Sequence, residues 1–455
     1  MAAPAQAQEL TSLSEELRGP LLLPHTEPYE AARRVFNGMI DRRPAFVAQC
    51  RGVADVKAVI AYARAHDLAV AVRGGGHNTA GHGTCDGGAL IDFSLMRTVR
   101  VDAEARTVRA DPGCSWTDFD AETSALGFAT TGGTVGSTGI GGLTLGGGLG
   151  FLMGSYGLTC DNVTSADLVT AAGEALTVSE ESHPDLFWGI RGGGGNFGVV
   201  TSFEYRLHEV DRLLGGLVIY PAEVARESLE LFREVCADAP DELSCAFVML
   251  TLPDGPRVSG IAACYNGPLD RGEALVRRLR ELGPPVDDGI RPMSYPEVQR
   301  TFAEIPFGLH NYWKGHFVRD LTDDVVEATM DTFDSITSEH SAVLIEAPHG
   351  AASRVPTDAT AFGQRDARFN VSGLAIWEPA EAPERHIAWA RGYAAGIAPA
   401  ATGGYFNYLA EDATSDDVAK AFGAKRFERL VALKDRYDPT NMFRFNQNIA
   451  PSPTG

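Results

Sequence analysis

A glycine turn followed directly by a histidine is the first group of residues that could do chemistry. Segment 73–78 has the sequence RGGGHN, so His77 comes directly after three glycines. Glycines in a turn let successive backbone N–H groups converge on an anion such as a phosphate. A histidine there would lie close to whatever molecule carries that phosphate. Taken alone, such a turn is more often an ordinary loop, and its histidine an ordinary loop residue.

Two further glycine clusters extend this pattern. Segment 132–150 is about half glycine with almost no charge, and segment 191–200 has the sequence RGGGGNFGVV. Their exposed backbone N–H groups could form a wall for a flat, extended cofactor, or the glycines could simply pack in a tight core turn. The third cluster leads into a strand and no GK[ST] follows any glycine run, so neither a dinucleotide fingerprint of the Rossmann type nor a P-loop is indicated. Because segment 132–150 contains so much glycine, it is not expected to form a regular helix.

A Tyr-Phe-Asn-Tyr tetrapeptide lies near the C-terminus, at 405–408. On a regular strand Tyr405 and Asn407 would face one way and Tyr408 the other. All three polar side chains reach one pocket only if the chain bends there. A phenol has an ordinary pKa of about 10, so a tyrosine base would need a cation or hydrogen bonds that lower its pKa.

Together these segments resemble the berberine-bridge-enzyme-like branch of the FAD-linked oxidases, and its bacterial members in particular. The resemblance extends from about residue 29 to 451. It is carried by RGGGHN, GGLTLGGGLGFLMGSYGLTCDN, PDLFWGIRGGGGNFGVVTSFEY and YDPTNMFRFNQNI. It implies the vanillyl-alcohol-oxidase fold, with an FAD-binding domain of the PCMH type.

The resemblance implies one FAD, covalently attached through its 8α-methyl carbon to His77. Many members add a thioether from a cysteine, but the matching position is Val135, which has no sulfur. Leu143 stands where relatives often have a histidine. The other residues implied to bind the cofactor are Arg73, Gly74, Gly75, Gly76, Asn78, Ser137, Thr138, Gly139, Gly142, Gly147, Asp161, Gly198, Val200, Asn446 and Asn448, together with Asn407 near the ribityl chain.

The same resemblance suggests how a substrate would be oxidised. Tyr408 would lie near the reacting carbon, and Asn370 occupies the position of a glutamate in plant relatives. Because an asparagine cannot take a proton, proton removal would fall mainly to Tyr408. Tyr405, Tyr312 and Trp313 are expected to contact the substrate, although for the last two ordinary packing is an equal alternative.

The expected reaction is hydride transfer from a small organic substrate, an alcohol, an amine or a natural-product intermediate, to the flavin. Dioxygen would then reoxidise the flavin and give hydrogen peroxide. An oxidative cyclase and a flavin-binding protein without turnover are the alternatives.

The order of the predicted elements indicates an α+β protein of two domains. Residues 1–28 are expected to be a loose leader, 29–207 the FAD-binding domain and 208–436 a substrate domain of antiparallel sheet backed by helices. Segment 437–455 would return to the FAD-binding domain. Apolar spacing predicts a helix over 53–66, the pattern at 98–111 a hairpin, and Ser115 the N-cap of a further helix.

Composition excludes several other classes of protein. Lys and Arg number 39 against 60 Asp and Glu, a formal net charge of −21, which disfavours nucleic-acid and membrane partners. No apolar run is long enough to span a bilayer. The seven cysteines form no metal-ligand spacing, nor do the histidines, so no metal is expected. Reduced thiols and the lack of a signal peptide suggest a cytoplasmic location.

Overall fold

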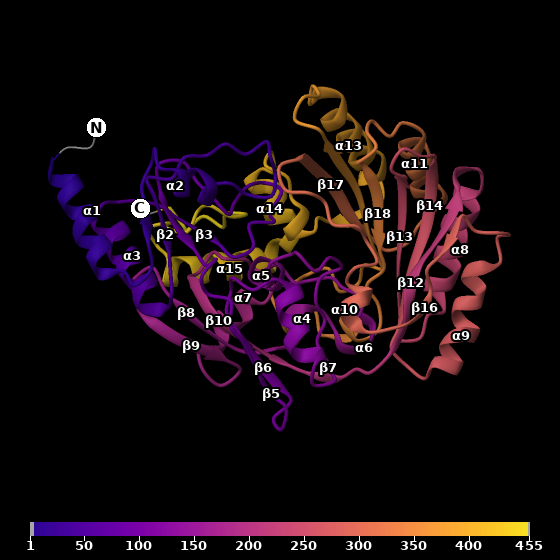
Figure 1. The fold of residues 1–455 in the computed structure, drawn as a ribbon, viewed down its shortest axis with the longest axis horizontal. Coiled ribbons are helices and arrows are strands. Elements are labelled where there is room, and N and C mark those ends of the chain that lie inside the picture. The colour runs from indigo at the N-terminus through magenta and orange to yellow at the C-terminus, as the bar shows by residue number, and fades with distance from the viewer. Residues whose placement is uncertain (1–3, 454–455) are drawn as a thin grey trace.

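The computed structural model describes residues 4–453 and divides the chain into two lobes. In Figure 1 the first lobe lies on the left, and the large sheet with its covering helices lies on the right. This α+β arrangement confirms the predicted fold class.

The first lobe contains two main sheets. One has the strand order β1-β2-β4-β3, with β2, β4 and β3 parallel, and the other is antiparallel with the order β5-β6-β10-β8-β9. Their bounds are β1 Leu21–Leu22, β2 Phe46–Gln49, β3 Val70–Arg73, β4 Ala89–Asp92, β5 Val99–Asp102, β6 Thr107–Ala110, β8 Val163–Val169, β9 Ala175–Ser179 and β10 Val199–Arg206. A short pair joins β7 Phe128–Ala129 to β11 His208–Glu209. The predicted hairpin is β5–β6.

The second lobe is built on one antiparallel sheet with the order β15-β12-β14-β13-β18-β19-β17-β20, and β16 pairs with β12. Its strands are β12 Leu213–Pro221, β13 Leu243–Thr251, β14 Arg257–Tyr265, β15 Asp287–Asp288, β16 Arg291–Met293, β17 His310–Val318, β18 Ala342–Glu346, β19 Phe369–Trp377 and β20 Ala401–Gly403. The predicted antiparallel sheet backed by helices is therefore confirmed.

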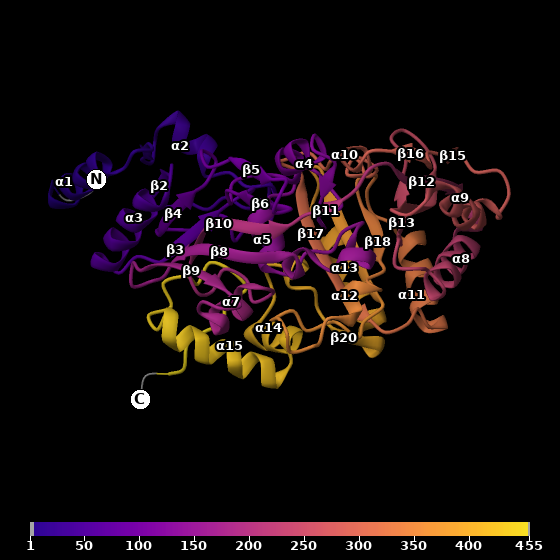
Figure 2. The same cartoon turned by 90° about the horizontal axis from the view of Figure 1, so that it is seen from below.

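Helices pack against the sheets of both lobes, and a few short ones lie between the lobes. Those of the first lobe are α1 Pro4–Glu16, α2 Glu27–Ala32, α3 Val53–Ala65, α4 Trp116–Ser124, α5 Ile140–Leu145, α6 Met153–Tyr156 and α7 Pro184–Ile190. Those that follow are α8 Ala225–Ala237, α9 Leu269–Arg277, α10 Tyr295–Val298, α11 Asp323–Asp334, α12 Ala351–Arg354, α13 Glu384–Ile397, α14 Ser415–Phe422 and α15 Ala424–Tyr437. Figure 2 shows α14 and α15 back beneath the first lobe, so the end of the chain rejoins its beginning.

Side-chain alternation on the large sheet decides which residues face the first lobe. On β18 and β19, Ile345 and Val371 belong to the core beneath α8, α11 and α13. Leu344 and Leu374 lie on the same two strands but point to the opposite face. They belong to a separate core that includes Phe151 of the first lobe. Because successive side chains on a strand point to opposite faces, only every second residue can reach the space between the lobes.

Two local expectations are wrong. Residues 4–28 are not a loose leader: they contain α1 and β1, and Leu13 is 3% exposed in a core shared with Val56 of α3. The amphipathic spacing of α1 is weak, so its order depends on this docking. Segment 132–150 does contain one short helix, α5, in spite of Gly141 and Gly142. Tertiary packing overrides the low helix propensity of glycine there.

Other local predictions are confirmed. The helix predicted over 53–66 is α3, Val53–Ala65. Ser115 caps α4: its hydroxyl accepts from the Asp118 N–H while the Asp118 carboxylate accepts from the Ser115 N–H. This reciprocal pair satisfies two N–H groups that the first turn of a helix leaves free.

Candidate functional site

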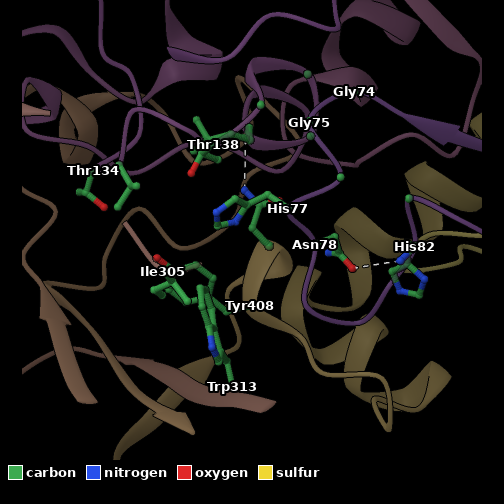
Figure 3. Close-up of a pocket in the computed structure, with 18 of the residues that line it drawn as sticks. Gly74, Gly75, His77, Asn78, His82, Thr134, Thr138, Ile305, Trp313 and Tyr408 are labelled. Carbon is green, nitrogen blue, oxygen red and sulfur yellow. Dashed lines mark hydrogen bonds between the residues drawn. The ribbon is translucent and has the colours of Figure 1, made fainter. Parts of the chain in front are cut away.

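A cavity of about 520 Å³ lies between the glycine segments of the first lobe and the large sheet of the second. Its size falls within the usual range of about 300–1,000 Å³ for ligand pockets. Figure 3 shows His77 in it, between the loop that carries Thr138 and the side chains of Trp313 and Tyr408. The space therefore opens to both lobes at once.

Two glycine segments interlock to form one wall of the cavity. A Cβ atom on Gly75 would lie 2.6 Å from the Gly139 Cα, and one on Gly139 would lie 2.5 Å from the Gly75 nitrogen. Both distances are shorter than any real contact, so a side chain at either position would push the turn and the second segment apart. A Cβ on Gly142 would meet nothing within 4 Å. Glycine is thus required at Gly75 and Gly139 for packing, and Gly142 leaves the backbone bare at the cavity.

His77 sits on this wall as a neutral imidazole. Its ring stacks on Phe36, with 4.0 Å between ring centroids and an interplanar angle of 14°. Burial lowers the pKa of His77 to about 4. At neutral pH the ring therefore keeps a nitrogen lone pair that can form a bond to carbon.

The lining of the cavity suits an FAD because it combines bare backbone with unused polar atoms. The glycine wall gives close access to backbone N–H groups, and a Cβ on Gly195 in the third segment would also meet nothing within 4 Å. Two side chains that line the cavity keep buried atoms without a partner in residues 4–453: Asn446 Oδ1 and His82 Nε2. Buried polar atoms normally have partners, so these two are suited to contact a bound ligand.

The Tyr-Phe-Asn-Tyr segment lies after β20 and forms one turn of 3-10 helix, Phe406–Tyr408. This turn is the bend that alternation required, and it brings Tyr405, Asn407 and Tyr408 to the same cavity. The Tyr405 hydroxyl accepts from the N–H groups of Gly148 and Leu149 and from Asn407 Nδ2, at 3.2, 3.3 and 3.0 Å. Tyr405 and Asn407 are therefore tied to the second glycine segment, while the Tyr408 hydroxyl is not.

The Tyr408 hydroxyl instead lies beside the carboxylate of Glu346, a residue that sequence reasoning missed, and the two groups interact electrostatically. Glu346 ends β18 directly opposite Asn370 of β19, whose Nδ2 donates to Glu346 Oε2 at 2.9 Å. Burial raises the pKa of Glu346 to about 7, although the neighbouring Asn370 and Tyr408 side chains act to lower it. The same burial and the nearby carboxylate raise the pKa of Tyr408 well above its ordinary value.

Family models match both ends of this site. An FAD binding domain matches residues 44–179, and a berberine and berberine-like domain matches residues 404–450. The chain is 33% identical to (R)-6-hydroxynicotine oxidase of Paenarthrobacter nicotinovorans, over 96% of this chain and 97% of that protein. It belongs to the berberine-bridge-enzyme-like FAD-linked oxidoreductases.

Two further comparisons agree with this family. An FAD-linked oxidoreductase of Dictyostelium discoideum is 32% identical over 98% of this chain and 97% of its own. The crystal structure of 6-hydroxy-D-nicotine oxidase from Arthrobacter nicotinovorans superposes with a TM-score of 0.87 at 30% identity, covering 96% of this chain and 98% of that one. The predicted resemblance is confirmed, and the protein is an enzyme of the oxidoreductase class with an FAD-binding domain.

Most of the residues predicted to bind FAD in this oxidoreductase line the cavity. They are Gly74, Gly75, Gly76, His77, Asn78, Val135, Thr138, Gly139, Gly142, Leu143, Gly198, Val200, Asn407 and Asn446. Ser137, Gly147 and Asn448 do not. Arg73 also lies behind the wall, where its guanidinium pairs with Asp92 at 2.7 Å and holds the turn from beneath.

Asp161 is not at the cavity either, contrary to the prediction. Its carboxylate binds both terminal nitrogens of Arg365, at 2.7 and 2.6 Å, and the Arg365 side chain is 1% exposed. Arg365 also donates to the Ala352 carbonyl and to Thr360. The pair joins the 3-10 turn Thr159–Asp161, which follows the second glycine segment, to the loop before β19. Asp161 thus holds the two lobes together.

Of the residues predicted to contact substrate, Tyr405 and Trp313 line the cavity and Tyr312 does not. Tyr312 and Trp313 are adjacent on β17, so they face opposite sides of the sheet. The Tyr312 hydroxyl donates to Asp412 at 2.7 Å and accepts from Arg391 at 3.0 Å. Asn370 lies beside Glu346 on the adjacent strand, where it is fully buried and does not line the cavity.

The described part of the chain holds no cluster of three or more His, Cys, Asp or Glu side chains arranged for a metal ion. Within residues 4–453 no helix combines the length and the apolar character needed to cross a bilayer. Cys114 and Cys160 are buried free thiols, and neither lines the cavity.

Proposed function

We propose that this oxidoreductase is an oxidase that removes a hydride and a proton from a small organic substrate, with dioxygen as the final acceptor. The observation that carries the proposal is the Tyr408–Glu346 pair at the glycine-walled cavity. When bound, FAD supplies the chemistry of a hydride acceptor that dioxygen can reoxidise, releasing hydrogen peroxide.

Proton removal would use the neighbouring Tyr408 hydroxyl and Glu346 carboxylate in sequence. A substrate O–H or N–H that donates to the Tyr408 oxygen can pass its proton there while Tyr408 passes its own to Glu346. Tyr408 then never has to exist as a free phenolate, which its raised pKa would make costly. Glu346, with its pKa near 7, is the final base, and Asn370 orients the carboxylate. This proposal extends the prediction that proton removal falls mainly to Tyr408.

The remaining residues would hold the cofactor and keep it oriented. The glycine turn 74–76 and the segment 138–142 offer backbone N–H groups to the phosphates. Asn407, whose Nδ2 donates to the Leu143 carbonyl at 3.2 Å, would lie beside the ribityl chain. Asn446 has an amide oxygen left for a ligand.

Anaerobic spectroscopy tests the oxidase proposal. With secondary alcohols, cyclic amines and sugars as trial substrates, an oxidase bleaches near 450 nm with its substrate, and the colour returns in air with one hydrogen peroxide per turnover. A protein that never bleaches with any candidate is a flavin binder, and bleaching that air does not reverse points to another electron acceptor.

We also propose that the flavin is covalently attached through His77. The proposal is supported by the position of a neutral imidazole at the cavity and by Val135 in place of a cysteine. Acid precipitation should leave a yellow pellet, and a tryptic peptide containing His77 should carry the flavin mass. In His77→Ala the pellet should be colourless, while the matched variant His82→Ala should keep its covalent colour. Free FAD in the wild-type supernatant would contradict the link.

A further inference from the structure

The sheet face that lines the cavity has two chemically different halves. Cross-strand pairs on β18 and β19 run from Ala342–Leu374 to Leu344–Ser372 and then to Glu346–Asn370. The last pair is fully buried and polar, and it meets Tyr408. The first is aliphatic and lies towards the open ends of the strands, where Ala342 is partly exposed.

Neighbouring strands extend the aliphatic half. On β13, Val248 lies opposite Leu344 and Leu250 opposite Ala342. Ile376 continues β19 beyond Leu374, and Trp313 of β17 lies opposite Leu374. Each of these side chains lines the cavity. The cavity lining also includes the apolar residues Phe302, Ile305, Pro306 and Leu309.

No polar side chain lines the interior of this half: Ser372, opposite Leu344, is fully buried and does not reach the cavity lining. The Trp313 Nε1–H is already donated to Asn311 Oδ1 at 3.2 Å. Within residues 208–376, the polar side chains that line the cavity, apart from Trp313, lie at its edges. They are Thr251, Glu304, Glu339 and His340. Thr251 ends β13, Glu304 and Glu339 are exposed, and His340 precedes β18.

We propose that this aliphatic half, defined by Val248, Leu250, Ala342, Leu344, Leu374 and Ile376, is a lipophilic subsite for the body of the substrate. The inference rests on the proposed oxidase function. It names the substrate class: a hydrophobic alcohol or amine with its one polar end at Tyr408. Carbohydrates are excluded because their hydroxyls would be buried against these side chains without hydrogen-bond partners.

A ligand series that does not depend on turnover tests the subsite. The probes are 2-butanone, 2-hexanone and 2-octanone, which share the skeleton of secondary alcohols but have no hydrogen on the carbonyl carbon. D-Glucono-1,5-lactone is the polar counterpart. Binding to the FAD-loaded protein is followed by the change in the visible flavin spectrum. The dissociation constant should fall about fourfold for each CH₂ added, until the subsite is full.

Substitutions on the sheet locate the effect. Leu374→Asn and the less buried Leu250→Asn should each remove most of the chain-length dependence. Leu217→Asn is the matched control, because Leu217 packs against the same core on β12 but does not line the cavity. Flavin content and melting temperature of each variant identify one that fails to fold, and the remaining variant then decides.

Each outcome bears on one proposal. A dissociation constant that does not depend on chain length, or a lactone that binds as tightly as 2-hexanone, overturns the lipophilic subsite. A chain-length effect that survives in both Leu374→Asn and Leu250→Asn overturns its location. If the ketones bind with the expected increments but no alcohol or amine bleaches the flavin, the subsite stands and the oxidase proposal fails.

Discussion

Replacing Glu346 by glutamine is expected to slow anaerobic flavin reduction by about 10²–10⁴-fold, the usual contribution of a general base. Glutamine keeps the size and an oxygen that can accept from Tyr408 and Asn370, so packing and flavin content should be unchanged. It cannot take a proton. Single-turnover reduction in a stopped-flow spectrometer measures this step apart from the reaction with oxygen.

The pH dependence of the same rate gives a second measurement. Burial raises the pKa of Glu346 to about 7, so the carboxylate form is lost as the pH falls through that value. The wild-type rate should therefore decline below about pH 7, and the glutamine variant should lose this dependence. The sign is fixed because only the deprotonated carboxylate can accept the proton.

Two further variants separate the residues of the pair. Tyr408→Phe deletes the hydroxyl that passes the proton, so it should be slow as well and should retain its flavin. Glu339→Gln changes an exposed glutamate at the edge of the cavity and serves as the matched control. If Glu346→Gln reduces as fast as Glu339→Gln, Glu346 is not the base.

Replacing Lys434 by methionine is expected to lower the free energy of unfolding by about 3–5 kcal/mol, since one charge of a buried pair would lose its partner. Lys434 and Asp438 are both fully buried and lie 2.7 Å apart. Lys434 Nζ also donates to the carbonyls of Asn196 and Phe443, each at 3.0 Å. Asp438 in turn accepts from the N–H groups of Met442 and Phe443.

These bonds connect α15 and the third glycine segment to the tail that carries Asn446. The variant should therefore lose FAD more readily as well as melt at a temperature lower by roughly 3–5 °C. Lys425→Met, exposed on the same helix, should change neither quantity. The double variant Lys434→Met/Asp438→Asn should recover part of the loss, because no unpaired charge remains. A melting temperature equal to that of Lys425→Met would show that the pair does not contribute.

Several features of the protein could be predicted from short stretches of sequence. The turn at 73–78, the hairpin β5–β6, helix α3 and the Ser115 cap all depend on residues close together in the chain. Glycine, apolar spacing and capping side chains act over a few residues. The α+β class and the lipophilic character of β18 and β19 follow from the same kind of pattern.

The sequence also shows which residues of a strand share a face, because side chains alternate between the two faces. Tyr312 and Trp313 cannot share a face, and Glu346 has the same phase as Leu344. An acidic residue in the otherwise apolar segment SAVLIEAP was a signal that could have identified it. The alternation pattern does not show which face of the large sheet meets the first lobe.

Only the tertiary structure decided which side chains work together. Glu346 meets Asn370 across two strands and Tyr408 from a later turn, and Asp161 finds Arg365 204 residues away. The docking of α1 on α3 likewise orders a segment whose own sequence suggested a loose leader. A pKa depends on burial and on charges brought close by folding, so a glutamate with a pKa near 7 cannot be distinguished in the sequence from an ordinary one. Sequence by itself determined the family, the glycine turn that lines the cavity and the elements around it, whereas the contact of Glu346 with Asn370, the Asp161–Arg365 ion pair and the two halves of the cavity were decided by contacts between residues far apart in the chain.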